Sequence, residues 1–77
     1  MTRSLHSPRL RRLAKTMAEA RRTKGLTQSE LARLLRRPQS FVSKYERGER
    51  RLDVVEFLEV AEAVGADPCK LLKSVRG

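Results

Sequence analysis

The stretch that decides the fold runs from Leu26 to Gly48 and reads L-T-Q-S-E-L-A-R-L-L-R-R-P-Q-S-F-V-S-K-Y-E-R-G. Thr27 and Glu30 predict a capping box at the start of a helix, because the hydroxyl accepts the Glu30 N–H while the carboxylate accepts the Thr27 N–H. Pro38 disfavours helical geometry in the residue before it, so the chain turns there. The stretch therefore predicts two short helices joined by a tight turn.

The two helices divide their apolar and polar side chains differently. We expect the first helix to bury Leu31, Leu34 and Leu35, which recur at helical spacing. In the second helix, which starts near Pro38 or Gln39, only Val42 and Tyr45 clearly point inward. Packing gives no reason for the residue types on its other face, which carries Gln39, Ser40, Ser43, Lys44 and Arg47.

Helical patterns also flank this stretch. Before it, Ser7 is a plausible N-cap with Pro8 at the first helical position, and Gly25 ends the helix. The apolar stripe of that helix carries Leu10, Leu13, Ala14, Met17 and Ala20. After it, Asp53 is a plausible N-cap, and Asp67 followed by Pro68 opens a last helix.

The helix after Asp53 is amphipathic. We expect it to bury Val54, Val55, Phe57, Leu58, Ala61 and Val64 and to expose Glu56, Glu59 and Glu62. No segment shows a strand pattern. The sequence predicts an all-α fold of five helices, with one domain over residues 8–73 between a basic tail at 1–7 and a C-terminal tail at 74–77.

Positive charge is concentrated in the first part of the chain. The 77 residues carry a net charge of +9, from 18 basic and 9 acidic side chains. Residues 1–51 hold 15 basic and 4 acidic side chains, a net of +11, whereas residues 52–77 hold 3 and 5, a net of −2. This asymmetry indicates a face that binds a polyanion; the alternative is a generally basic, soluble surface.

Several classes of function lack any signal. The chain has one histidine, His6, and one cysteine, Cys69, so it offers neither a metal-ligand cluster nor a catalytic triad. We expect Cys69 to be a small buried hydrophobe, and we expect no enzyme activity and no cofactor. No apolar run approaches the roughly 20 residues that span a bilayer, and the first residues lack a secretory pattern. A cytoplasmic protein is the resulting expectation.

The motifs L-T-Q-S-E-L-A and K-Y-E-R-G within the opening stretch closely resemble the Cro and phage-repressor helix-turn-helix family, also called the XRE family. The resemblance extends over about Leu10 to Leu72. It implies a five-helix, lambda-repressor-like domain in which the third helix enters the major groove of DNA and the second lies across the backbone.

The resemblance also implies roles for individual residues. Gln39, Ser40 and Lys44 correspond to residues that read bases, and Gln28 to a phosphate anchor that braces Gln39. Arg21 and Glu46 match a buried ion pair. The chemistry agrees, since glutamine pairs bidentately with adenine and lysine donates to guanine. Phosphate contacts are expected from side chains at the ends and loops around the reading helix, namely Arg37, Arg47, Arg50 and Arg51, and from Ser43 on the helix itself. Phe41 either contacts a thymine methyl group or packs over the turn, and packing is favoured.

The turn departs from the family pattern. The family usually has glycine where this chain has Arg36, an apolar residue at Arg37, and a serine or threonine N-cap at Pro38. A left-handed arginine at position 36 would cost roughly 1 kcal/mol or more.

The expected function is a sequence-specific regulator of transcription, most simply a repressor, that binds double-stranded DNA as a homodimer on a pseudo-palindromic site and is therefore associated with the nucleoid. The last two helices would supply the dimer contact through Leu58, Leu71, Leu72 and Val75. An antitoxin or a restriction-controller protein of the same fold is the alternative, and a membrane-surface or protein-interaction module is less favoured. The chain shows no separate sensing domain, so we expect no small-molecule effector.

Overall fold

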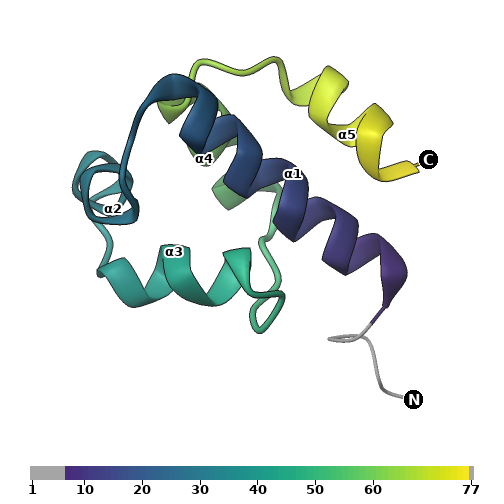
Figure 1. Ribbon diagram of the computed structural model, residues 1–77, viewed down its shortest axis with the longest axis horizontal. Helices are drawn as coiled ribbons and strands as arrows, with labels where there is room; N and C mark the ends of the chain where they lie inside the picture. The colour runs from purple at the N-terminus through teal and green to yellow at the C-terminus, as the bar shows by residue number, and fades with distance from the viewer. Residues whose placement is uncertain (1–6, 77) are drawn as a thin grey trace.

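The computed structural model describes residues 7–76, and these form five helices with no strand (Figure 1). The helices are α1 (Pro8–Lys24), α2 (Gln28–Leu35), α3 (Gln39–Glu46), α4 (Val54–Ala63) and α5 (Pro68–Arg76). The prediction of an all-α, five-helix fold is confirmed. Residues 1–6, including His6 and most of the expected basic tail, lie outside the described residues. Ser74, Val75 and Arg76 belong to α5 and not to a C-terminal tail.

Helices α1, α2 and α4 start where a side chain caps free N–H groups of the first turn. The Ser7 hydroxyl accepts from the Leu10 N–H at the start of α1 (3.0 Å). Thr27 and Glu30 form the expected capping box at α2, with distances of 3.0 and 2.9 Å. Asp53 caps α4 in the same way, and there the returning carboxylate belongs to Glu56 (3.0 Å).

The turn between α2 and α3 contains a left-handed arginine. Arg36 has φ 56° and ψ 43°, and it is the only non-glycine residue with positive φ among residues 7–76. The Arg37 N–H donates to the Ala32 carbonyl (3.0 Å) and the Arg36 N–H to the Arg33 carbonyl (3.1 Å), as in a Schellman motif. Pro38 follows in an extended conformation, and α3 starts at Gln39 without a side-chain cap.

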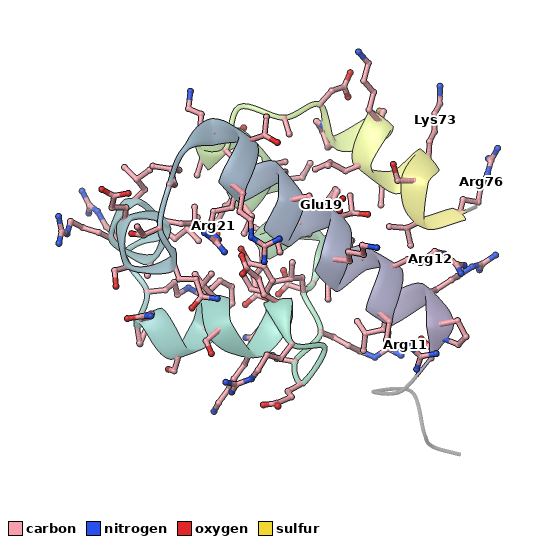
Figure 2. All side chains as sticks on the ribbon, viewed as in Figure 1. Arg11, Arg12, Glu19, Arg21, Lys73 and Arg76 are labelled. Carbon is pink, nitrogen blue, oxygen red and sulfur yellow. The ribbon has the colours of Figure 1, made fainter. Side chains whose placement is uncertain are left out.

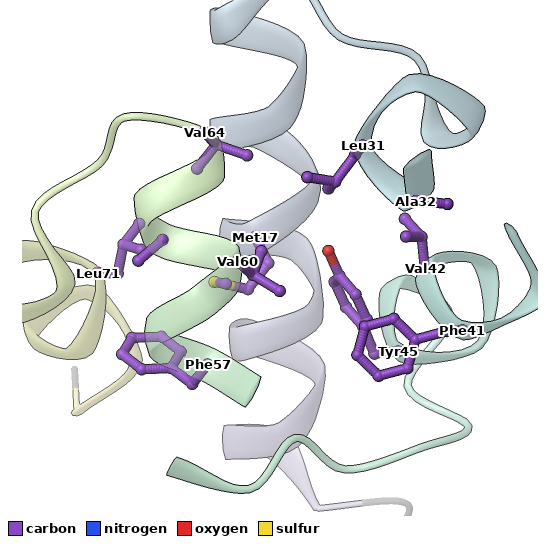
Figure 3. Packing of buried hydrophobic residues seen from close by; sticks show 11 residues of the cluster. Met17, Leu31, Ala32, Phe41, Val42, Tyr45, Phe57, Val60, Val64 and Leu71 are labelled. Atoms are coloured by element: carbon purple, nitrogen blue, oxygen red, sulfur yellow. The ribbon is translucent and has the colours of Figure 1, made fainter. Parts of the chain in front are cut away.

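One apolar core joins the helices (Figure 3). The ring of Tyr45 lies edge-on to that of Phe41, with centroids 5.3 Å apart and an interplanar angle of 71°. Both rings are buried, so the preference for Phe41 as a packing residue agrees with the structure. The most completely buried side chains come from four helices and are Met17, Leu31, Val42, Tyr45 and Val60.

Several expectations about burial were wrong. Leu34, Val54, Val55 and Leu58 are 60%, 74%, 64% and 42% exposed, and Cys69 is exposed as well. The apolar stripes of α2 and α4 are wider than the surfaces that neighbouring helices cover. In α2 the buried residue beside Leu31 is Ala32, so Leu34 lies outside the packed face. In α4 the buried face includes Glu56, expected in solvent, and leaves the three apolar residues outside.

Candidate nucleic-acid interface

The outer face of α3 is polar and accessible. Gln39, Ser40, Lys44 and Arg47 are exposed, and Ser43 is half-buried. The opposite face of this short helix carries Phe41, Val42 and Tyr45, which anchor it in the core. The three residues expected to read bases therefore lie together on the exposed face of one helix. The packing of the other face fixes the direction in which their side chains point.

A chain of hydrogen bonds runs from the interior to the start of this face. Glu46 accepts from Arg21 through both carboxylate oxygens, at 2.8 and 3.1 Å. The amide of Gln28 donates to Glu46 Oε1 (3.0 Å), and its oxygen accepts from Gln39 Nε2 (3.4 Å). The Ser29 hydroxyl donates to Gln39 Oε1 (2.8 Å). The expected bracing of Gln39 by Gln28 is present, and Ser29 is a partner that the sequence interpretation missed.

These bonds orient the Gln39 amide and leave part of it available. An amide oxygen has two lone pairs and an amide nitrogen has two hydrogens. Ser29 and Gln28 each use one of these positions. One lone pair and one N–H remain, which are the two groups that glutamine needs to pair with the N6 and N7 positions of adenine.

The inner end of this chain is an ion pair shielded from water. The side chains of Arg21 and Glu46 are 10% and 5% exposed. The hydrogen bond that Arg21 donates to Glu46 raises the pKa of the Arg21 guanidinium, although burial opposes the charged form. Arg21 also donates to the Leu26 carbonyl (2.7 Å), and Figure 2 shows it reaching from α1 towards α3. The pair thus joins α1, the α1–α2 connection and the end of α3.

Two arginines expected to contact phosphate are held by an internal carboxylate. Arg50 donates to both oxygens of Glu56 (2.9 Å each), and Arg37 donates to one of them (3.2 Å). Both guanidinium groups lie over the Phe41 ring, that of Arg37 at 4.5 Å and that of Arg50 at 4.8 Å from its centroid. The hydrogen bond from Arg50, with help from the Asp53 N–H and Arg37, lowers the pKa of Glu56 to about 2.

This cluster changes the interpretation of Arg37 and Arg50. Their guanidinium groups connect the turn and the loop around α3 to the start of α4, which is a structural task. The sequence does indicate that Glu56 lies at the start of its helix, because Asp53 and Glu56 repeat the spacing of the capping box at Thr27 and Glu30. That spacing places the carboxylate beside its own helix start, where both arginines reach it.

The remaining residues proposed for phosphate contact lie around α3. Arg47 pairs with Glu49 (3.1 Å), and both side chains are more than half exposed. The carbonyl of Arg51 accepts from Arg50 (2.8 Å), and the Arg51 side chain is exposed. Gln28 lies at the start of α2 and Ser43 in the middle of α3. Their contacts with phosphate stay predictions.

Residues 7–76 hold no group of three or more histidine, cysteine or acidic side chains placed to bind a metal ion. Within the same part of the chain, no helix is long and apolar enough to cross a membrane.

Comparison with known proteins supports the geometry. The family model described as "Helix-turn-helix domain" matches residues 10–72. An XRE-family like protein from Pseudomonas syringae pv. tomato is 50% identical, with a TM-score of 0.81 over 88% of this chain and 83% of that one. No curated protein sequence matches this chain.

Two further solved structures are similar. The restriction-modification controller protein C.AhdI from Aeromonas hydrophila is 35% identical, with a TM-score of 0.75 over 80% of this chain and 94% of its own. The clp gene regulator ClgR from Corynebacterium glutamicum is 28% identical, with a TM-score of 0.83 over 90% of this chain and 73% of its own.

Proposed function

The chain belongs to the XRE family of helix-turn-helix DNA-binding regulators, and from that premise we propose that it is a sequence-specific regulator of transcription, most simply a repressor, that reads the major groove of double-stranded DNA with α3. We infer a binding protein that acts in the cytoplasm without enzyme activity, cofactor or small-molecule effector.

One observation carries this proposal: the exposed polar face of α3 begins at a glutamine whose amide is oriented by a hydrogen-bonded chain anchored on a buried ion pair. A solvated surface helix gains little from such support. A reader of bases gains much, because a side chain that is already oriented loses less entropy on binding. Gln39, Ser40 and Lys44 read bases in this proposal, and phosphates are bound by Gln28, Ser43, Arg47 and Arg51.

We further propose that the protein acts as a homodimer through α4 and α5. Val55 and Leu58 on α4 and Leu72 on α5 are exposed, at 64%, 42% and 50%. Leu71, also expected in this contact, is only 8% exposed and supports the core instead. Two copies related by a two-fold axis would present their α3 helices to half-sites about 34–36 Å apart.

A restriction-modification controller is the second candidate. It is favoured by the 35% identity to C.AhdI, most of whose length this chain covers. The neighbouring genes distinguish the two candidates, since a controller is expected beside a restriction endonuclease and a methyltransferase.

Selection from a random duplex pool, followed by sequencing, tests the proposal. The expected result is enrichment of a short inverted repeat, and light scattering at high micromolar concentration should give the mass of two chains. Equal recovery of all sequences would overturn sequence-specific reading. A mass of one chain, with and without the selected duplex, would overturn the homodimer.

A further inference from the structure

A second basic feature lies beside the reading helix, on α1. A groove of about 330 Å³ runs between one face of α1 and the end of α3. From α1 it is lined by Arg11, Ala14, Lys15, Ala18 and Arg22, and from the end of α3 and the following turn by Glu46, Arg47 and Gly48. The function proposed above assigns no role to the residues from α1.

The groove exists because small residues line up at its base. Ala14 and Ala18 are one helical turn apart and buried, and Gly48 faces them across the groove with φ 74°. Longer side chains at these positions would fill the space between α1 and the turn after α3. The rims, in contrast, carry the long basic side chains.

The groove is strongly positive. Four of its lining residues are cations, of which Arg47 pairs with Glu49, and the one carboxylate in the lining, Glu46, is paired with Arg21. Lys15 and Arg22 are exposed and form no ion pair with any residue that the structure describes. Like charges gathered in a concave surface raise the local concentration of an anionic ligand.

The groove is continuous with the reading face. Arg47, the C-cap residue of α3, lines the groove and is exposed at the end of the reading face. Glu46, at the groove wall, is hydrogen-bonded to Gln28 at the start of α2. Along α1, the cations extend from Arg11 to Arg22, which is about 16 Å at 1.5 Å per residue. Each DNA strand carries one phosphate per about 3.4 Å of helix axis, so a row of this length is long enough to reach more than one phosphate.

We propose that this groove binds the sugar-phosphate backbone of the DNA that α3 reads, with Lys15 and Arg22 of α1 as phosphate ligands. The inference rests on the proposed function and extends its interface to the first helix. Ammonium and guanidinium groups both donate to phosphate oxygens, and neither group here would have to give up a protein partner to do so. These contacts hold the duplex without reading its sequence.

The double variant Lys15→Gln with Arg22→Gln tests the proposal in the full chain. Its matched control is Lys70→Gln with Lys73→Gln, which removes the same charge from exposed positions on α5. Figure 2 shows Lys73 pointing away from α3. Both pairs lower the net charge equally, so a general effect of charge would appear equally in both.

Affinity falls as salt rises, and loss of two phosphate contacts should make the negative slope of log affinity against log salt shallower by about 1.8. At 0.15 M salt this corresponds to an affinity about 30-fold weaker for the selected duplex and for random duplex alike. The α5 control should stay within about 3-fold of the unchanged protein. Circular dichroism should show both variants folded, because all four side chains are exposed.

Equal losses in the two variants would overturn the groove as a binding site while leaving the proposed function intact. A loss confined to the selected duplex would also overturn it, since phosphate contacts do not distinguish sequences. If the unchanged protein binds no duplex, the proposed function itself fails, and the groove proposal falls with it.

Discussion

Arg21 of α1 and Glu46 of α3 form two parallel hydrogen bonds, Nε to Oε2 at 2.8 Å and Nη2 to Oε1 at 3.1 Å. This bidentate geometry is the strongest form of arginine–carboxylate pairing. Because the same carboxylate accepts from Gln28, the orientation of the proposed reading helix depends on a contact made by a helix outside the helix-turn-helix. The stability of the fold and the proposed recognition of bases are therefore linked through one pair of side chains.

Replacing Arg21 with methionine should destabilise the domain strongly. The change leaves Glu46 buried without its cation, and breaking a buried pair in this way costs about 3–5 kcal/mol. Urea unfolding followed by circular dichroism measures the difference. Arg22→Met, at the neighbouring exposed position, should change the free energy of unfolding by less than about 0.5 kcal/mol. If Arg21→Met lowers the free energy of unfolding by less than about 1 kcal/mol, the ion pair contributes little to stability.

Tyr45→Phe should leave the stability unchanged or raise it by up to about 1 kcal/mol. The Tyr45 hydroxyl is buried and has no hydrogen-bond partner among the described residues. Burial, together with the nearby Glu46 charge, raises the pKa of this phenol. Phenylalanine keeps the packing against Phe41 and removes the unsatisfied group. A clear drop in the melting temperature would mean that the hydroxyl is satisfied in solution.

Arg36→Gly should stabilise the domain. At φ 56° an arginine bears a left-handed strain of about 1–2 kcal/mol, which glycine lacks. Part of this gain is offset because glycine makes the unfolded chain more flexible, so a net gain of about 0.5–1 kcal/mol is expected. Arg36→Ala is the control, since it removes the same charge but keeps Cβ and the strain. If alanine stabilises as much as glycine, charge and not backbone strain is responsible.

Glu56 should make stability fall in acid. The folded-state pKa of about 2 lies below the ordinary value of 4.5. The stabilisation from the charged carboxylate is therefore fully present above about pH 4.5 and is lost as the pH falls towards 2. At pH 7, Glu56→Gln should cost about 1–3 kcal/mol, because hydrogen bonds to charged groups contribute that much.

The difference between Glu56→Gln and the unchanged protein should shrink when urea unfolding is repeated from pH 5 down to pH 2. Glu59→Gln, exposed on the same helix, should track the unchanged protein throughout. A difference that stays constant over this range would contradict the role assigned to the Glu56 charge.

Gln39→Ala should weaken binding to the selected duplex by about 1–3 kcal/mol and binding to random duplex very little. The variant removes the amide that Gln28 and Ser29 orient, and with it a bidentate contact to a base. Fluorescence anisotropy with both duplexes measures the two affinities. Ser29→Ala is the companion variant. It removes only the hydrogen bond that orients the Gln39 amide, so it should weaken binding to the selected duplex by less than Gln39→Ala does. Equal losses on both duplexes would remove Gln39 from the residues that read sequence.

Local features of the chain could be predicted from the sequence by itself. Ser7, Thr27 and Asp53 start their helices as expected, because a cap depends on residues at most three positions away. Family motifs placed Arg21 opposite Glu46 and Gln28 beside Gln39, contacts that the structure contains.

Burial and long-range pairing were decided only by the tertiary structure. Helical spacing shows which face is apolar but not how much of it a neighbouring helix covers, and so Leu34 and Val55 were wrongly expected to be buried. Glu56 looked like one of three solvated acids until the packing of α4 against the turn brought Arg37 and Arg50 to it. Charges that lie apart in the sequence meet only when the helices between them are in place, and this determines which arginines pair with a carboxylate inside the fold.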